Sequence, residues 1–530
     1  MKKFITLCVA AVVLVAVVCG VLAGCDPNGF ASGFGTDNNG YAKNDEEVQR
    51  LISVVPNERQ LEFLEMEYYN FIHFGMNTFT RKQWGTGEED PATFNPTALD
   101  TDQWCEIIKN SGSTGVIITA KHHDGFCLWQ TSTTEHSVKN SPWMNGQGDV
   151  VKMLSESCEK YGLKMGIYLS PWDMNAESYG DTEAYNKFYM DQLRELLGGE
   201  YGPDFNGDGK GEIFCVWMDG ARGEDEDIPA DFEYKMDEWE DLIWTLQPDC
   251  VSTNLGSDVR WIGNEAGNTR KSEWSVVSQG NASNQEQQSS EEDADRLQEV
   301  DPSAEDIGSR ELLAKYRDLV FYPAEADMVI NNPNGTWFWN GSDLVKPGST
   351  LLERYVSTVG GNASLLLNLA PNDRGLIPEA TKNSLEDFKA LLDATTAKPA
   401  EVSSIKIGDS KSTEEKEGLD NLLNTGRDGY TFGENEYIID IELASPIVPG
   451  RLDIREDLRS SQRVEKFEVW CKDSGGDWVQ LADETVIGNR NIMLFESSKE
   501  FTVPETSLIR IVIKQSRWVP VLRSIQLYAA

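Results

Sequence analysis

Four histidines are the first residues in this chain whose type and spacing could do chemistry. All of them lie between positions 73 and 136 of the 530 residues: His73, His122, His123 and His136. A zinc site is one interpretation, but HExxH and HxxEH spacings are absent, and the adjacent His122 and His123 would point in opposite directions from a strand. A neutral imidazole both donates and accepts hydrogen bonds, which suits a ligand rich in hydroxyl groups, such as a sugar. Buried structural histidines remain the alternative.

The composition favours the same class of ligand. The chain has 47 Lys+Arg against 88 Asp+Glu, a net charge of −41. This charge excludes nucleic acid as the natural partner, because phosphate binding needs clustered basic residues. The 15 Trp, 16 Tyr and 20 Phe supply flat surfaces on which a sugar ring can stack.

These residues must be positioned by regular elements. Between about residues 60 and 395, short apolar runs alternate with amphipathic patterns, which predicts an α/β fold, a (β/α)8-like TIM barrel. The predicted strands are 69–74, 115–120, 164–169, 213–218, 250–254, 327–331 and 364–369, and the predicted helices include 101–110, 149–161, 182–197 and 232–246. Polar residues lie at the C-terminal ends of several strands, among them His73, Asp124, Asp173 and Asp219. Barrel enzymes place their active site at these strand ends, so we expect one site assembled from several strands.

The pattern changes after residue 397. Period-two strands without helices, such as 436–443, 450–455, 465–471, 477–481 and 508–514, predict an all-β sandwich of the galactose-binding-like type. We therefore place a catalytic barrel at 59–397 and the sandwich at 398–530. No aromatic platform stands out in the sandwich, which favours bracing of the barrel over carbohydrate binding.

Residues 1–25 have the pattern of a bacterial lipoprotein signal. Lys2 and Lys3 precede an apolar run, and small residues stand directly before Cys25, which would become the lipidated N-terminus. An uncleaved membrane anchor is the alternative, but the apolar run is short. Residues 26–58 are predicted to be a flexible spacer. We expect a protein of the bacterial cell envelope that contacts the membrane only through this lipid and faces the periplasm or the cell surface.

Five motifs in order carry a resemblance to a known family. They are FIHFG at 71–75, TAKHHDGF at 119–126, GIYLSPWD at 166–173, WMDGA at 217–221 and LLLNLAPN at 365–372. Together they resemble the α-L-fucosidases of glycoside hydrolase family 29, and the sandwich also resembles the C-terminal domain of that family. The resemblance implies a retaining mechanism without a cofactor, acting on fucosylated oligosaccharides or glycoproteins. Asp219 matches the nucleophile; a strand-end Asp that caps the next segment is the alternative.

The general acid/base is less constrained by the motifs. Glu265, in GNE at 263–265, resembles the acid/base of the branch that cleaves α-1,3 and α-1,4 linkages, and the flanking Trp261 could raise its pKa by excluding water. Glu325 and Asp124 are the rival candidates.

The resemblance also implies the substrate contacts. His73, Trp84, His122, His123 and Tyr168 match positions that contact sugar hydroxyls. Phe71, Trp217 and Trp337 would pack on the C6 methyl group of fucose, although each aromatic residue could instead belong to the core.

Metal binding is a weaker possibility. Asp204, Asn206 and Asp208 resemble the first half of a calcium loop, but the twelfth position is Cys215 rather than Glu, so a polar turn is favoured. We predict no metal. Two other interpretations stay open: a surface glycan-binding lipoprotein that has lost catalysis, and a fucosidase of broad linkage specificity. The sequence leaves the oligomeric state undetermined.

Overall fold

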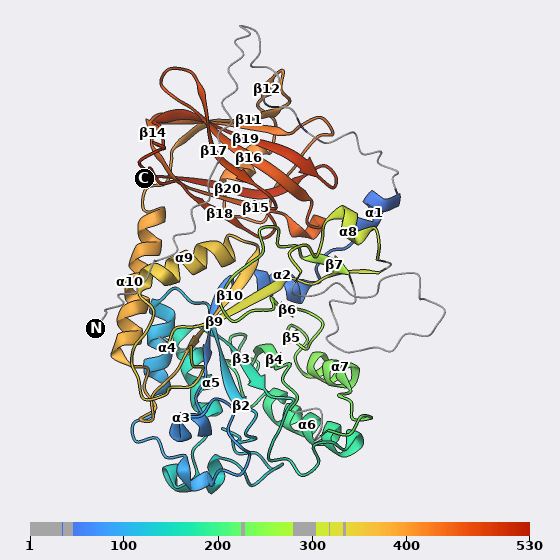
Figure 1. Ribbon diagram of the computed structural model, residues 1–530, viewed down its shortest axis with the longest axis vertical. Coiled ribbons are helices and arrows are strands. Elements are labelled where there is room, and N and C mark those ends of the chain that lie inside the picture. The colour runs from blue at the N-terminus through green and yellow to red at the C-terminus, as the bar shows by residue number, and fades with distance from the viewer. Residues whose placement is uncertain are drawn as a thin grey trace, which may run out of the picture.

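The computed structural model describes residues 34, 36, 46–223, 228–278, 304–316, 318–331 and 335–530. Figure 1 shows a barrel with helices around it in the lower half and a β sandwich above. The predicted signal at 1–25, with Cys25, lies outside the described residues. In the described part of the chain, every helix is too short or too polar to cross a membrane.

Eight parallel strands form the barrel, in the order β5-β4-β3-β2-β1-β10-β9-β6. Their bounds are β1 (Tyr68–Ile72), β2 (Gly115–Lys121), β3 (Lys164–Leu169), β4 (Ile213–Met218), β5 (Val251–Asn254), β6 (Arg260–Trp261), β9 (Ala324–Val329) and β10 (Ala363–Leu369). Nearly every residue in them is buried, as in strands covered on both faces. A single parallel bridge between Thr253 and Val259 links β5 to the residues before β6, so the barrel is nearly closed. The predicted barrel is confirmed.

Helices cover the outside of the barrel. The longer ones are α4 (Thr101–Asn110), α5 (Val150–Tyr161), α6 (Thr182–Leu197), α7 (Met236–Leu246), α9 (Gly348–Val359) and α10 (Glu379–Thr396). An aspartate caps the start of three of them: Asp100, Asp149 and Asp181 each accept a backbone N–H from the first turn. Asp149, predicted to be helical, is therefore the cap, and α7 begins four residues later than predicted.

The prediction missed strand β6 and misplaced strand β9. Strand β9 begins at Ala324 rather than 327, because Ala324 and Glu325 pair with β10 on one side and with the two-residue strand β6 on the other. Glu325 and Asp327 therefore lie inside a buried strand. Two acidic residues interrupt the apolar pattern there, so periodicity alone did not reveal the strand.

The shorter elements are α1 (Glu46–Ile52), α2 (Glu58–Leu64), α3 (Met76–Thr80), α8 (Arg310–Leu313), β7 (Val276–Ser278) and β8 (Leu319–Phe321). Helix α1 lies inside the predicted flexible spacer, and its Val48 and Leu51 are buried. Phe34 is also buried, against the sandwich, with its ring 5.4 Å from that of Trp470 and 4.8 Å from the guanidinium of Arg510. The prediction of a flexible spacer is wrong for these residues, because their apolar side chains pack on the folded domains.

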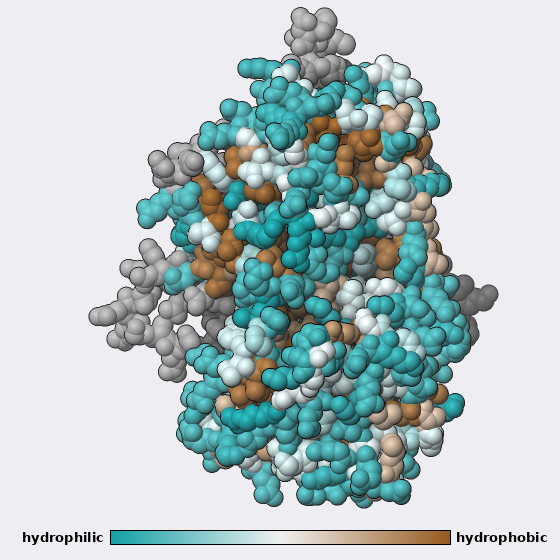
Figure 2. Space-filling view, turned by 180° about the vertical axis from the view of Figure 1, so that it is seen from behind, coloured by the Kyte–Doolittle hydropathy of each residue, from teal (hydrophilic) through white to brown (hydrophobic). Residues whose placement is uncertain are grey.

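The C-terminal domain is a two-sheet antiparallel sandwich, as predicted. Its strands are β11 (Val402–Gly408), β12 (Thr413–Glu414), β13 (Tyr430–Thr431), β14 (Ile438–Ile447), β15 (Pro449–Glu456), β16 (Val464–Lys472), β17 (Trp478–Glu484), β18 (Asn491–Leu494), β19 (Thr506–Ser516) and β20 (Val521–Ala529). One sheet has the order β12-β11-β14-β19-β16-β17 and the other β13-β20-β15-β18. In the view from behind, hydrophilic residues cover most of the lower, barrel half (Figure 2).

The sandwich packs against the amino ends of the barrel strands. Glu67, directly before β1, pairs with Arg455 and Arg490 of the sandwich. Asn362, directly before β10, accepts the backbone N–H of Asn489 at 2.6 Å. These contacts hold the sandwich at the end of the barrel opposite to the carboxyl ends of the strands, where the predicted site residues lie.

Glu67 carries a prediction about stability. Burial by itself would raise the pKa of this carboxyl, but Arg490 and Arg455 outweigh it and hold the pKa below its usual value. A lowered pKa stabilises the fold above the pKa of the unfolded chain, and this stabilisation is lost as the pH falls through the folded pKa. Glu67→Gln removes the carboxylate partner of the partly buried Arg455 and one of the two carboxylate partners of Arg490, and should lower the free energy of unfolding by about 2–4 kcal/mol at pH 7.

Glu65→Gln is the matched control. Glu65 also pairs with a sandwich arginine, Arg523, but its side chain is 37% exposed. Its loss should cost less than about 1 kcal/mol. Denaturant unfolding at pH 7 and pH 4 measures both variants. Equal losses for the two would contradict the assigned role of Glu67, as would a Glu67→Gln effect that does not shrink at pH 4.

Candidate active site

Asp219 stands directly after strand β4, where the barrel opens. Its Oδ1 accepts the backbone N–H of Ala221 at 2.8 Å, and its Oδ2 accepts the hydroxyl of Tyr168 at 3.0 Å. The Nε2 atom of His123 lies 3.7 Å from the same Oδ2. The side chain is 26% exposed, so the carboxylate is oriented by its neighbours and still open to a ligand.

An aromatic floor lies beside Asp219. The rings of Tyr168 and Trp217 stack at 5.3 Å with an angle of 14° between their planes. Phe71 meets Trp217 edge-on at 5.1 Å, and Trp337 meets Phe71 at 6.2 Å. The three side chains predicted to contact the methyl group, Phe71, Trp217 and Trp337, therefore lie together in one apolar cluster of the barrel interior.

Hydrogen bonds fix the tautomers of two histidines. The side-chain amide of Asn368 donates to the carbonyl of Trp337 at 2.7 Å, so its Oδ1 faces His73 Nδ1, also at 2.7 Å, and must accept from it. The hydroxyl of Ser170 donates to the carbonyl of Trp172 at 2.6 Å and therefore accepts from His123 Nδ1. In a neutral ring this leaves Nε2 of each histidine as a hydrogen-bond acceptor.

The histidines at the site are neutral. Burial lowers the pKa of His73 to about 3 and lowers the pKa of His122 and His123 as well. The rings of His122 and His123 lie only 4.1 Å apart, so the expectation that they point in opposite directions is wrong: strand β2 ends at Lys121, and the alternation of a strand does not extend to them. Within the described residues, Nδ1 of His122 is buried without a hydrogen-bond partner.

Glu265 lies in the loop that follows β6. Its side chain is exposed, yet the protein around the carboxyl raises its pKa by desolvation, a hydrogen bond with Trp337 opposes this rise, and the charge of Asp219 adds to it. The carboxyl is therefore near both Trp337 and Asp219. Trp261 was predicted to exclude water from Glu265, but its indole N–H instead donates to Asp327 at 3.0 Å. The aromatic residue beside the Glu265 carboxyl is Trp337.

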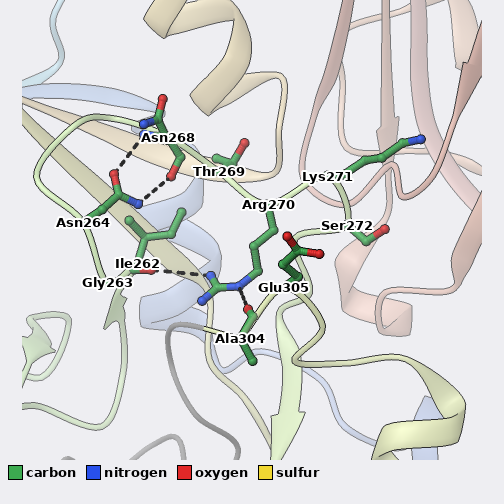
Figure 3. Close-up of a pocket in the computed structure, with 10 residues that line it drawn as sticks. All are labelled: Ile262, Gly263, Asn264, Asn268, Thr269, Arg270, Lys271, Ser272, Ala304 and Glu305. Carbon is green, nitrogen blue, oxygen red and sulfur yellow. Dashed lines mark hydrogen bonds between the residues drawn. The ribbon is translucent and has the colours of Figure 1, made fainter. Parts of the chain in front are cut away.

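Asn264 shapes the turn that presents Glu265. Its amide donates to the carbonyl of Asn268 at 3.0 Å, and its Oδ1 accepts the N–H of Ala266 at 3.1 Å. Figure 3 shows the Asn264–Asn268 contacts at the edge of a pocket of about 540 Å³. The residues that line it include Arg270 and Glu305 but neither Asp219 nor Glu265, so this pocket is separate from the predicted site.

The two rival acid/base candidates, Glu325 and Asp124, are buried in the protein. Glu325 is 1% exposed and accepts the indole N–H of Trp217 at 2.6 Å, and the hydroxyl of Tyr69 contacts its other oxygen. Asp124 is also 1% exposed and is held by the amide of Asn77 and the N–H of Phe126. Burial raises the pKa of each to about 7. Neither carboxyl is open to a substrate in this arrangement.

Trp84 stands at the rim of the site. It is 56% exposed and meets the rings of Trp172 and His123 edge-on at 5.6 and 6.1 Å. The structure thus brings all the predicted substrate contacts to the carboxyl ends of β1, β2, β3 and β4 and the loop before Trp337. It also reveals Asn368 and Ser170, which the sequence analysis missed. Both stand inside the quoted motifs, and a polar residue at a buried strand end was their only signal.

The calcium candidates use their oxygens locally. Asp204 accepts the backbone N–H groups of Gly207 and Gly209 at 2.7 and 2.9 Å, and Asn206 and Asp208 also accept N–H groups of the same loop. Among the described residues, no group of three or more His, Cys, Asp or Glu side chains could hold a metal ion. The six cysteines of the described chain are buried thiols.

The comparisons with known proteins decide the family. A sequence model described as Alpha-L-fucosidase matches residues 41–396. The chain belongs to the alpha-L-fucosidase family. It is 37% identical over 483 residues to Alpha-L-fucosidase 1 of Arabidopsis thaliana, covering 89% of this chain and 87% of that protein.

Solved fucosidase-family structures share the fold. A glycoside hydrolase 29 family member from a rumen bacterium is 32% identical, with a TM-score of 0.70, covering 90% of this chain and 77% of the other. A Ruminococcus gnavus GH29 fucosidase in complex with fucose is 27% identical, with a TM-score of 0.73, covering 94% of this chain and 98% of the other. The resemblance seen in the sequence is thus confirmed. This protein is an alpha-L-fucosidase, a glycoside hydrolase whose substrates are fucosylated glycans.

Proposed function

We propose that this fucosidase removes terminal fucose by double displacement, with Asp219 as nucleophile and Glu265 as acid/base. The observation that carries the proposal is the pairing of an oriented, open carboxylate with a second carboxyl close enough for its pKa to be raised by the charge of the first. In such a pair, the ionised group attacks the anomeric carbon and the protonated group gives its proton to the leaving oxygen. Glu265 then takes a proton from the water that hydrolyses the ester.

The neighbouring side chains suit the sugar. The Nε2 atoms of His73 and His123 would accept hydrogen bonds from fucose hydroxyls. Phe71, Trp217 and Trp337 supply an apolar wall for the C6 methyl group. Trp84 at the rim would cover the outer face of the bound sugar.

The test of these roles uses one variant of each carboxyl. Asp219→Asn keeps the shape of the side chain but cannot attack, so turnover should fall at least ~10³-fold while the fold is preserved. In Glu265→Ala, an activated aryl fucoside still forms the ester, and azide should restore turnover by giving the α-fucosyl azide with retained configuration. Glu305→Ala, at the separate pocket, is the control and should leave kcat/KM unchanged. A trapped fucosyl-enzyme peptide that lacks Asp219 would contradict the assignment.

We further propose that the enzyme prefers α-1,3 and α-1,4 linkages. What supports this is the GNE sequence at 263–265 and the position of Glu265 in a loop beyond the barrel mouth, where a second sugar would lie. A galactose bound there would orient the glycosidic oxygen toward Glu265, and its binding energy would lower the barrier as well as KM.

The ratio of kcat/KM for a Lewis x trisaccharide over 2′-fucosyllactose measures this preference. We expect a ratio well above one, because α-1,2-linked fucose presents its galactose from another direction. A small aryl fucoside should be a poor substrate relative to Lewis x. A ratio near or below one would show a fucosidase of broad linkage specificity, and the family assignment would be unaffected.

We also propose that a lipid on Cys25 tethers the enzyme to the bacterial cell envelope. The lipobox supports the anchor, and the burial of Phe34 supports a short tether on the sandwich side. Phe34 is nine residues after Cys25, so this stretch of chain spans at most about 30 Å. The sandwich would then lie nearest the membrane, with the barrel mouth on the far side.

Cys25→Ala should release the protein from membranes without changing its hydrolysis of fucosides, since the lipid only holds the enzyme in place. Cys19→Ala changes a cysteine inside the apolar run of the signal and should leave the protein membrane-bound. Partition of both variants between detergent and aqueous phases is the measurement. Continued partition of Cys25→Ala into the detergent phase would refute the lipobox interpretation.

A further inference from the structure

Strand β9 carries two buried carboxyls that the proposed reaction does not use. Glu325 and Asp327 are 1% and 2% exposed, and because they are two positions apart on one strand they face the same side, the barrel interior. Within the described residues, their side chains hydrogen-bond to neutral groups, those of Tyr69, Trp217 and Trp261. A carboxyl buried without a cation is costly, so its presence calls for a role.

Each of these carboxyls holds the indole of a different strand. Trp217 of β4 donates to Glu325 Oε1 at 2.6 Å, and Trp261 of β6 donates to Asp327 Oδ1 at 3.0 Å. Trp217 stands two residues before Asp219, and Trp261 stands four residues before Glu265. The two carboxyls of β9 are thus joined to the two strands that lead to the proposed catalytic residues.

The connection continues to the catalytic groups themselves. Trp217 stacks on Tyr168, whose hydroxyl donates to Asp219 Oδ2 at 3.0 Å. Near Glu265, the backbone N–H of Ile262 donates to the backbone carbonyl of Glu325 at 2.9 Å. The backbone N–H of Gly267 donates to the backbone carbonyl of Asp327 at 3.0 Å. These two backbone bonds bracket the loop that carries Glu265.

We propose that Glu325 and Asp327 are positioning residues, which hold the Trp217 and Trp261 indoles and thereby set the placement of Asp219 and Glu265. Glu325 positions the nucleophile Asp219 through Trp217 and Tyr168, and Asp327 positions the acid/base Glu265 through Trp261. This proposal rests on the roles proposed above for Asp219 and Glu265.

Removing Glu325 and removing Asp327 should change the dependence of kcat/KM on the leaving group in different ways. Glu325→Leu removes the acceptor of Trp217 and misplaces the nucleophile, so kcat/KM should fall ~10–100-fold for dinitrophenyl fucoside and for a natural trisaccharide alike. Asp327→Leu misplaces the acid/base Glu265, so kcat/KM should fall to the same extent with the trisaccharide. The fall should be small with dinitrophenyl fucoside, because its leaving group needs no proton. Azide should restore the slow deglycosylation of Asp327→Leu and leave Glu325→Leu unchanged.

Conservative variants separate positioning from simple loss of stability. Glu325→Gln and Asp327→Asn keep one acceptor oxygen, and each should recover most of the rate lost by the corresponding Leu variant. Glu240→Gln is the control, because Glu240 is a buried carboxyl of α7 that accepts from Ser252 and Ser257, away from the site. It should lower the melting temperature without changing the leaving-group dependence.

A double-variant cycle tests the route through Trp217. On a Trp217→Phe background the indole N–H is gone, so Glu325→Leu, which lowers the rate in the wild-type enzyme, should have little further effect on kcat. Additive effects, or Leu variants whose leaving-group dependence matches that of Glu240→Gln, would overturn the proposal. If the trapping and azide experiments on Asp219 and Glu265 succeed, that failure belongs to the positioning proposal alone.

Discussion

Exclusion of water from the carboxyl ends of the barrel strands is the constraint on which the rest of the site depends. A buried imidazole loses the hydration that stabilises its charge, so the histidines at the mouth are neutral. A neutral ring needs one donor and one acceptor partner, and Asn368 and Ser170 each fill one of these roles for a histidine. The remaining ring nitrogen is left for a substrate hydroxyl. Burial therefore converts an ordinary set of histidines into directed acceptors for a sugar.

The same constraint governs the carboxyl groups, with different outcomes. Lys121 and Asp173 neutralise each other as a buried ion pair at 2.8 Å. Within the described residues, the Glu325 carboxyl hydrogen-bonds to the neutral side chains of Tyr69 and Trp217, and burial raises its pKa to about 7. Asp219 keeps part of its surface open and is stabilised by hydrogen bonds from Tyr168 and Ala221. The arrangement separates the carboxyls into those that can react with a ligand and those that support the structure. The sandwich lies at the other end of the barrel, where its arginines neutralise Glu67 and leave the mouth free.

Sequence patterns predicted the elements whose sequences follow a regular apolar pattern. The bounds of β3, β4, α4 and α6 agree with the apolar periodicity, because each is a regular run ended by a capping or turn residue. Strand β9 and helix α1 were misjudged, since their structure depends on pairing with β6 and on packing against other parts of the chain. The motifs indicated which side chains meet at the mouth. They could not show that Trp261 bonds to Asp327 while Trp337 neighbours Glu265, because these contacts join strands far apart in the sequence.

The central claim is that burial and fixed hydrogen bonds hold the site histidines neutral in one tautomer. Nitrogen-15 NMR of histidine-labelled enzyme, with His73 assigned by a His73→Gln variant, measures both properties directly. The account predicts that His73 carries its proton on Nδ1 and stays neutral down to a pH of about 3. Titration of His73 near the ordinary histidine value, or a proton on Nε2 in the free enzyme, would contradict it.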